Sequence, residues 1–190
     1  KPLSVLLYRD RDLVNDMFAR VGQLLLNFYA VLAENDCVGA SVLGDDMGYK
    51  GGTLINPEFM TELVLPWQRR LADAAHKQGK PFILHSCGNL ETIMDDIIDN
   101  VKVDAKHSFE DTYLPIVKAK KLYGHRIALI GGIYMDVLSR QSTHDVRKYV
   151  SNVLKACKPG GGYCLGSGNT IANYVPLENY LTMLNVGLDE

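Results

Sequence analysis

Short segments, most of them apolar, alternate along most of this chain with longer segments in which apolar residues recur every three or four positions. The short segments have the length of β-strands and lie at residues 37–43, 81–84, 103–106, 127–130 and 163–165. The longer segments, of about 10 to 20 residues, have the spacing of one helix face. Strands that alternate with helices form parallel sheets in α/β proteins. The pattern therefore predicts a parallel sheet of five strands.

Two long helices flank the first of these strands. Residues 1–36 are expected to contain a leading helix and the segment that leads into it. The helix itself is expected over 13–33. Its apolar residues, which we expect to face the core, are Leu13, Met17, Val21, Leu24, Phe28 and Leu32. The second helix begins at Asn56-Pro57, where a capping side chain precedes a proline at the first helical position. We expect Pro66 to kink this helix.

Polar or unusual residues directly follow every predicted strand. They are Asp45-Asp46, His85-Ser86-Cys87, His107 to Asp111, Gly131-Gly132 and Cys164 to Asn169. In a (β/α)8 barrel the chemistry lies at the carboxyl ends of the strands. A dinucleotide-binding fold would carry a glycine-rich fingerprint after its first strand, and this sequence has none there. The predicted fold class is α/β, of the (β/α)8 TIM-barrel type.

A complete barrel of this type has eight strands in about 250 residues. This chain has five predicted strands in 190 residues. We therefore expect one domain over 1–190 that contains only the C-terminal five or so βα units of a barrel. About three further units would lie on the amino-terminal side of Lys1.

Charge and apolar content argue against two classes of partner. Twenty Lys and Arg against 22 Asp and Glu leave a net charge of −2, so no broad positive field draws the chain to nucleic acid or to anionic lipid. The apolar stretches are shorter than the roughly 20 residues that span a bilayer, and no segment resembles a signal peptide. We expect no nucleic-acid partner, no membrane association and a cytoplasmic location.

The four cysteines are too few for a disulfide scaffold, so each is a core residue, a nucleophile or a metal ligand. Cys37 lies inside the first predicted strand and Cys157 on the apolar face of a helix, so we expect both in the core. His85 and Cys87 follow a strand and are two residues apart, which places their side chains on one side of an extended segment. Cys164 lies at the end of another strand.

Barrel closure would bring Cys164 beside His85 and Cys87. Two thiolates and one imidazole suit zinc, and three protein ligands leave the fourth tetrahedral position open for water or substrate. We therefore expect His85, Cys87 and Cys164 to bind a catalytic zinc ion. The alternative is a chance His-x-Cys pair in which the cysteine is a small apolar residue.

Carboxylates follow two of the predicted strands. Glu110 is expected to supply a further zinc ligand or to orient one, and the alternative is a solvated acid that caps the next helix. Asp45 and Asp46 open a loop over 45–56 and are expected to face the substrate as catalytic acids or as part of a lid. The alternative for this pair is that it caps a turn. For His107 we expect a structural role.

The segments 85–89 and 162–166 resemble those of the uroporphyrinogen decarboxylase superfamily, and the chain looks most like its zinc-dependent corrinoid methyltransferases. The resemblance runs from about Val38 to the end and includes 160–169. A similar order of His, Cys, Glu and Cys occurs in cobalamin-independent methionine synthase. The decarboxylases of the superfamily lack such thiol ligands, and their arginine-rich amino-terminal active-site segment has no counterpart here.

The resemblance implies roles for particular residues. The zinc ligands would be His85, Cys87 and Cys164. A carboxylate 25 residues beyond the histidine would be an additional ligand, which favours Glu110 over Asp111. Ser167 and Asn169 are expected to bind the corrinoid.

The resemblance also implies a reaction and partners. The reaction is methyl transfer between a corrinoid (methylcobalamin), carried by a partner protein, and a thiol or methoxylated substrate, with Zn2+ as the metal. Members of the superfamily often form dimers, so a homodimer is a further expectation. Two alternatives stay open: a decarboxylase-like enzyme without metal, and a non-catalytic fragment that binds only zinc or a corrinoid partner.

Overall fold

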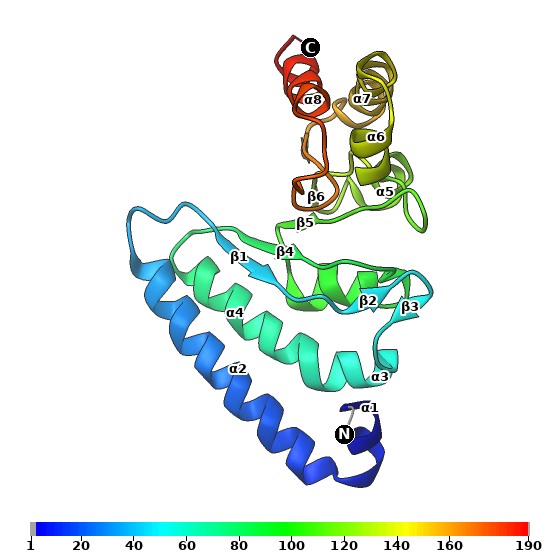
Figure 1. Cartoon of the computed structure of the whole chain (residues 1–190). Coiled ribbons are helices and arrows are strands. Elements are labelled where there is room, and N and C mark those ends of the chain that lie inside the picture. Colours follow the sequence, from blue (N-terminus) through cyan, green and yellow to red (C-terminus); the bar gives the residue numbers. More distant parts are fainter. Residues whose placement is uncertain (1–2, 190) are drawn as a thin grey trace.

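The computed structural model describes residues 3–189 and contains a parallel sheet of five strands in the order β1-β4-β5-β6-β7. The strands are β1 (Ser41–Gly44), β4 (Phe82–His85), β5 (Ala105–His107), β6 (Ala128–Ile130) and β7 (Tyr163–Cys164). Strands that follow one another along the chain are neighbours in this sheet, as in a TIM-type barrel (Figure 1). Within residues 3–189 the sheet ends at β1 and β7 and is not closed into a complete barrel. The predicted fold class and the five strands are confirmed.

The last residues of the strands lie at one level across the sheet. Gly44 pairs with His85, His85 with His107, His107 with Ile130, and Ile130 with Cys164. Residues that pair across neighbouring strands point to the same face of the sheet. The side chains of His85, His107 and Cys164 therefore share one face at the carboxyl edge.

The two faces of the sheet differ in burial. Phe82, Leu84 and Leu129 point to one face and are completely buried there. Val42 points to the other face and is 56% exposed. The side chains of β1 accordingly alternate between the buried and the exposed face.

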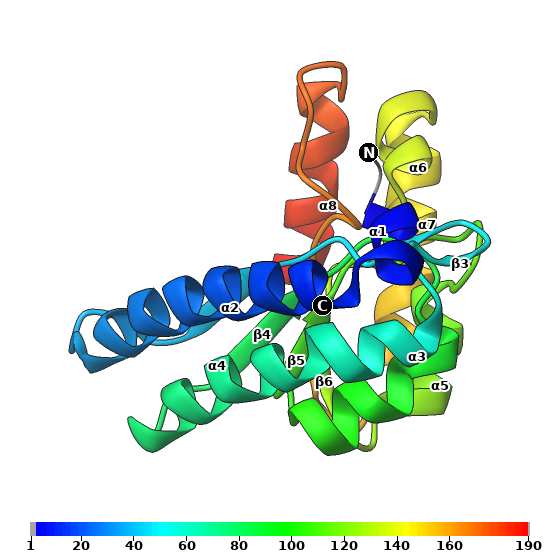
Figure 2. The ribbon, with the colours of Figure 1, turned by 90° about the horizontal axis from the view of Figure 1, so that it is seen from below.

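Helices α2 (Arg11–Glu34) and α4 (Leu65–Lys77) lie side by side next to β1 and β4 (Figures 1 and 2). The apolar stripe predicted to face the core faces solvent instead, and Leu24 is 70% exposed. The buried residues of α2 are Val14, Gly22, Tyr29 and Ala33. A Cβ at Gly22 would lie 2.1 Å from the Trp67 ring. The helices thus approach closely through the face with small residues, which turns the apolar stripe outward.

The helix predicted from Asn56 onward consists of three parts. It begins as α3 (Pro57–Phe59), continues as a π-helical turn (Met60–Val64) and becomes α4. The Asn56 side chain caps its start, as predicted. At the place of the expected kink, before Pro66, the helix contains this π-helical turn, in which the Leu65 N–H bonds to the carbonyl five residues earlier. Because proline has no N–H, the helical hydrogen bonds are interrupted at this place in any case.

The remaining elements complete the described chain. A hairpin of β2 (Gly48–Tyr49) and β3 (Gly52–Thr53) occupies the loop that was expected over 45–56. The other helical elements are α1 (Leu3–Arg9), a 3-10 turn (Glu91–Ile93), a π-helix (Asp96–Val101), α5 (Ile116–Tyr123), α6 (Met135–Arg140), α7 (Thr143–Cys157) and α8 (Leu177–Asp189). Figures 1 and 2 show α7 and α8 next to each other.

Two cysteines were expected in the core. Cys157 is buried at the end of α7, which confirms the expectation for it. Cys37 is exposed, because the predicted strand 37–43 begins only at Ser41 and leaves Cys37 in the preceding loop. Among residues 3–189, no helix has both the length and the apolar character needed to span a membrane.

Candidate metal centre

The carboxyl ends of β1 and β4 bring three potential metal ligands together. Asp46, His85 and Cys87 each offer one ligand atom, and these atoms lie within 4.8 Å of one another. His85 Nε2 lies 3.7 Å from Asp46 Oδ1 and 3.6 Å from Cys87 Sγ. Zinc bonds of about 2.0 to 2.3 Å at tetrahedral angles place ligand atoms about 3.3 to 3.8 Å apart. The spacing and the donor atoms therefore fit a zinc ion.

Hydrogen bonds between the two strand ends hold this cluster in place. The Asp46 carboxylate accepts the main-chain N–H of Cys87 at 2.9 Å. The buried Ser86 hydroxyl accepts the N–H of Met47 at 3.1 Å. Gly88 follows with a φ of +84°, and a Cβ there would lie 2.1 Å from the backbone of β2. The loop after β4 can lie against the hairpin only because residue 88 is glycine.

Two side chains from neighbouring loops donate hydrogen bonds to the Cys87 sulfur. Ser108 Oγ lies 3.4 Å and Asn169 Nδ2 3.3 Å from Sγ. Burial raises the pKa of the Cys87 thiol, and the hydrogen bond from Ser108 partly opposes this rise. The negative charges of Asp46 and Glu110 raise the pKa further. Without a cation the thiol is therefore protonated at neutral pH, and a bound cation favours the thiolate.

Alkylation of the metal-free protein tests this thiol chemistry. Only the thiolate reacts with iodoacetamide, so we expect modification of Cys87 to reach half its maximal rate above pH 9.0, the ordinary value for a thiol. Peptide mass spectrometry measures the rate, and exposed Cys37 is the internal control. A half-maximal rate below pH 9.0 would show that the carboxylates and burial do not control this thiol.

A buried lysine lies beneath the cluster. Lys106 is 3% exposed and points, with its neighbour in register Leu84, to the buried face of the sheet. Its ammonium donates to the carbonyl oxygens of Ser86, His107 and Ser108, at 3.1, 3.3 and 2.9 Å. Burial lowers the pKa of Lys106 to about 8, and the negative groups of the site oppose this change. The ammonium thus joins the ends of β4 and β5.

A second histidine lies against His85. The Nδ1 atoms of His85 and His107 are 2.6 Å apart. The other ring nitrogen of His107, Nε2, lies 3.1 Å from the Ser167 carbonyl oxygen. Burial lowers the pKa of His107, and the Ser167 carbonyl opposes this change. His107 therefore contacts a potential ligand, in addition to the structural role that we expected.

The third predicted ligand, Cys164, is not part of this cluster. It is exposed at the end of β7, on the same face and at the same level as His85. Two strands separate β4 from β7, so three spacings of about 4.8 Å place them about 14 Å apart along the sheet. Cys164 can share a metal with His85 only if the curvature of a barrel shortens this path. Its role as a ligand stays a prediction.

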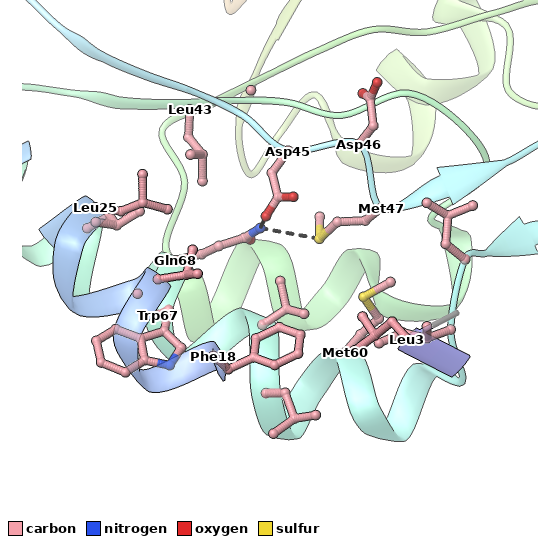
Figure 3. Close-up of a pocket in the computed structure, with 18 residues that line it drawn as sticks. Leu3, Phe18, Leu25, Leu43, Asp45, Asp46, Met47, Met60, Trp67 and Gln68 are labelled. Atoms are coloured by element: carbon pink, nitrogen blue, oxygen red, sulfur yellow. Dashed lines mark hydrogen bonds between the residues drawn. The ribbon is translucent and has the colours of Figure 1, made fainter. Parts of the chain in front are cut away.

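Asp45 and Asp46 point in different directions (Figure 3). Asp46 points away from the pocket in the figure, whereas Asp45 points into this apolar pocket of about 350 Å³ between β1, α2 and α4. There the Gln68 side chain donates to Asp45 at 2.8 Å. Burial raises the pKa of Asp45, and the hydrogen bond from Gln68 opposes this change. Asp45 contributes to the packing between β1 and α4, and its catalytic role stays a prediction.

The other predicted residues surround the cluster. Glu110 lies in the loop after β5, outside the cluster but near enough to raise the pKa of Cys87. Asp111 accepts a hydrogen bond from Tyr149 at 2.8 Å and is directed elsewhere. Ser167 and Asn169 reach the cluster through His107 and Cys87, respectively. Their predicted contact with a corrinoid stays a prediction.

The comparison with known families agrees with this arrangement. The sequence matches the family described as Uroporphyrinogen decarboxylase (URO-D) over residues 2–187. The chain belongs to the URO-D family. The resemblance inferred from the residues is thereby confirmed. No sequence among the curated proteins is similar enough to this chain to count as a match.

A solved structure described as "methyltransferase from Methanosarcina mazei" has the same fold as this URO-D chain. The TM-score is 0.79 at 18% identity, over 97% of this chain and 51% of the other. The chain therefore spans about half the length of that protein. At this identity the similarity establishes the fold, and the parallel five-stranded sheet with its helices matches part of a TIM-barrel-like URO-D fold.

Three features of this URO-D site were not predicted from the sequence. Asp46 was assigned to substrate and not to metal, because its approach to His85 depends on the pairing of β1 with β4. Lys106 had a signal, since this lysine is the middle residue of the short strand β5. No sequence signal indicated the role of Ser108, because its orientation toward Cys87 depends on a left-handed backbone with a φ of +82°.

Proposed function

We propose that this URO-D family chain carries the zinc site of a corrinoid-dependent methyltransferase. The observation that supports this most directly is the cluster of Asp46, His85 and Cys87 at the carboxyl edge of the sheet. A thiolate and an imidazole suit zinc, whereas magnesium and calcium take oxygen ligands. The fold shared with a protein described as a methyltransferase is a second support.

Asp46, His85 and Cys87 would hold the ion, and Cys164 is the ligand that the sequence adds. A bound zinc ion favours the thiolate form of a substrate thiol at neutral pH, or polarises the oxygen of a methyl ether. The Asp46 side chain is 62% exposed, whereas that of His85 is 26% exposed. Asp46 is therefore the ligand that can most easily give up its position to a substrate.

Side chains of the protein would hold the Cys87 sulfur in place and take the proton from a substrate thiol. Ser108 and Asn169 hold the Cys87 sulfur through their hydrogen bonds. Glu110, in the adjacent loop, is the group that we assign as acceptor of the proton from a substrate thiol. A methylcorrinoid would supply the methyl group, which would pass to the sulfur of the substrate while the electron pair of the cobalt–carbon bond stayed with the corrinoid.

The carboxyl edge of the sheet is where we place the approach of the corrinoid. Asp46, His85 and Cys87 lie at this edge, where the sites of TIM-type barrels are found. A corrinoid is large, so we propose that a separate corrinoid protein presents it at this edge. The methyl group would pass to a thiol or come from a methoxylated compound.

Incubation of the zinc-loaded protein with methylcobalamin and thiols tests this function. We expect the absorption of methylcobalamin to disappear and the methylated thiol to appear in mass spectra. Cys87→Ser should abolish both changes, and Cys37→Ser, at an exposed position far from the cluster, should leave them intact. A reduced corrinoid with methoxylated aromatics tests the reverse direction.

Two other results would contradict the proposal. Zinc-independent release of CO2 from a porphyrinogen would favour the decarboxylase-like alternative. Zinc binding without methyl transfer in either direction would favour the non-catalytic alternative.

A further inference from the structure

The nitrogen through which His85 can bind a metal depends on the position of its ring proton. A neutral imidazole carries one proton, on Nδ1 or on Nε2, and only the bare nitrogen can be a ligand. Nε2 of His85 faces Asp46 and Cys87, at 3.7 and 3.6 Å. A metal in this cluster therefore needs the proton of His85 on Nδ1.

The hydrogen bonds behind His85 determine where this proton lies. The Ser167 carbonyl oxygen can only accept, so His107 Nε2, at 3.1 Å, must donate to it. When both rings are neutral, the single proton of His107 is on this Nε2, so its Nδ1 is bare and can only accept. His85 Nδ1, 2.6 Å away, must then be the donor. His85 Nε2 is left with a lone pair that faces the cluster.

The packing around Ser167 and His107 holds this geometry. Ser167 forms a β-bridge with Ile133, and the Gly168 N–H donates to the Ile133 carbonyl at 2.7 Å. Gly131 has a φ of +84°, and a Cβ there would lie 2.5 Å from the Ser167 oxygen and 2.8 Å from His107 Nε2. A side chain at residue 131 would therefore separate the two groups, and glycine lets them meet.

We propose that the Ser167 carbonyl and His107 form a relay that fixes His85 in its Nδ1–H tautomer and so presents Nε2 to the metal. His107 is then a positioning residue for the ligand. Ring nitrogens of metal-binding histidines that do not bind the metal commonly have such a hydrogen-bond partner. The purpose of the relay rests on the proposed function, whereas the tautomer is a property of the metal-free protein.

Long-range 1H–15N correlation spectra of histidine-labelled, metal-free protein test the relay. At a pH where both rings are neutral, we expect the proton of His85 on Nδ1 and that of His107 on Nε2. His107→Phe removes the acceptor, so His85 should shift toward the Nε2–H form. His107→Asn offers an amide oxygen near the former Nδ1 position and should keep the Nδ1–H form. His85→Asn assigns the signals, and His144→Asn, at an exposed position on α7, is the control.

Zinc affinity, measured by competition with a chelator, gives an independent result. We expect His107→Phe to lower the affinity by about 10- to 100-fold, as for other partners of metal-binding histidines, and His107→Asn to restore part of it. An Nε2–H tautomer of His85 in the wild-type protein would overturn the relay, even if His107→Phe does not fold. An unchanged tautomer in a folded His107→Phe protein would overturn it as well. The predicted tautomer in a protein that binds no zinc would overturn the proposed function and support the relay.

Discussion

Replacing Cys87 with serine is expected to weaken zinc binding by more than about 100-fold. Loss of a side chain that only supports a ligand already costs about 10- to 100-fold, and Cys87 is itself a proposed ligand. His85→Asn should have a comparable effect, because its Nε2 and the Cys87 sulfur lie 3.6 Å apart on the same cluster. Competition with a chromophoric chelator measures the affinity, and circular dichroism checks that each variant is folded.

Other cysteines give matched controls for this prediction. Cys37→Ser changes an exposed thiol outside the cluster and should leave the affinity unchanged. Cys164→Ser distinguishes two sets of ligands. A large loss of zinc affinity means that Cys164 on β7 is the third protein ligand, and an unchanged affinity means that Asp46 is. Zinc binding that survives both Cys87→Ser and His85→Asn would contradict the proposed site.

Replacing Lys106 with methionine is expected to lower the free energy of unfolding by about 2 to 4 kcal/mol at neutral pH. Methionine fills a similar volume, but the carbonyl oxygens of Ser86 and Ser108 lose the ammonium that donates to them. Each buried acceptor left without a donor costs about 1 to 3 kcal/mol, and relief from burying a charge offsets part of this. Denaturant unfolding followed by circular dichroism measures the difference.

The pH dependence of this difference has a defined sign. The pKa of Lys106 is about 8 in the folded protein, below its ordinary value of 10.5. Between these two pH values the unfolded chain binds more protons, so Lys106 makes the folded state more stable as the pH rises. The difference in the free energy of unfolding between wild type and Lys106→Met should therefore increase over this pH interval. A difference that stays constant would contradict the lowered pKa.

Lys80→Met is a matched control for the Lys106 variant. Lys80 also donates to two main-chain carbonyls, those of Ala33 and Asn35, at 2.6 and 2.5 Å. It lies away from the metal cluster and closer to solvent. We expect a smaller loss of stability and unchanged zinc affinity for Lys80→Met, whereas Lys106→Met should also weaken zinc binding by displacing the ends of β4 and β5.

The strands and their order follow from local features of the sequence. Most of the strands are short apolar segments bounded by polar residues, and helices between them enforce parallel neighbours. The orientation of α2 could not be predicted in this way. Its large apolar residues, such as Leu24, form a clear stripe, but the close approach of Gly22 to the Trp67 ring decides which face packs. That contact joins residues 45 positions apart in the sequence.

In the candidate site, too, the residues that depend on local sequence were predicted, and those that depend on contacts between distant segments were not. His85 and Cys87 were predicted because their alternation in an extended segment is local. The position of Asp46 beside His85 and Cys87 depends on the register between β1 and β4. The hydrogen bond from Asn169 to Cys87 joins residues 82 positions apart. Periodicity contains no information about such distant pairs. Cys164 was predicted from its place at a strand end, and the sheet puts it on the same face as His85 but three strand spacings away.

X-ray absorption spectroscopy of the zinc-loaded protein tests the central claim most directly. We expect a first coordination shell with both sulfur and nitrogen or oxygen, at about 2.3 and 2.0 to 2.1 Å, and with the multiple-scattering signal of one imidazole. The sulfur contribution should disappear or decrease in Cys87→Ser. A shell of nitrogen and oxygen alone in the wild-type protein would contradict a zinc site built on His85 and Cys87.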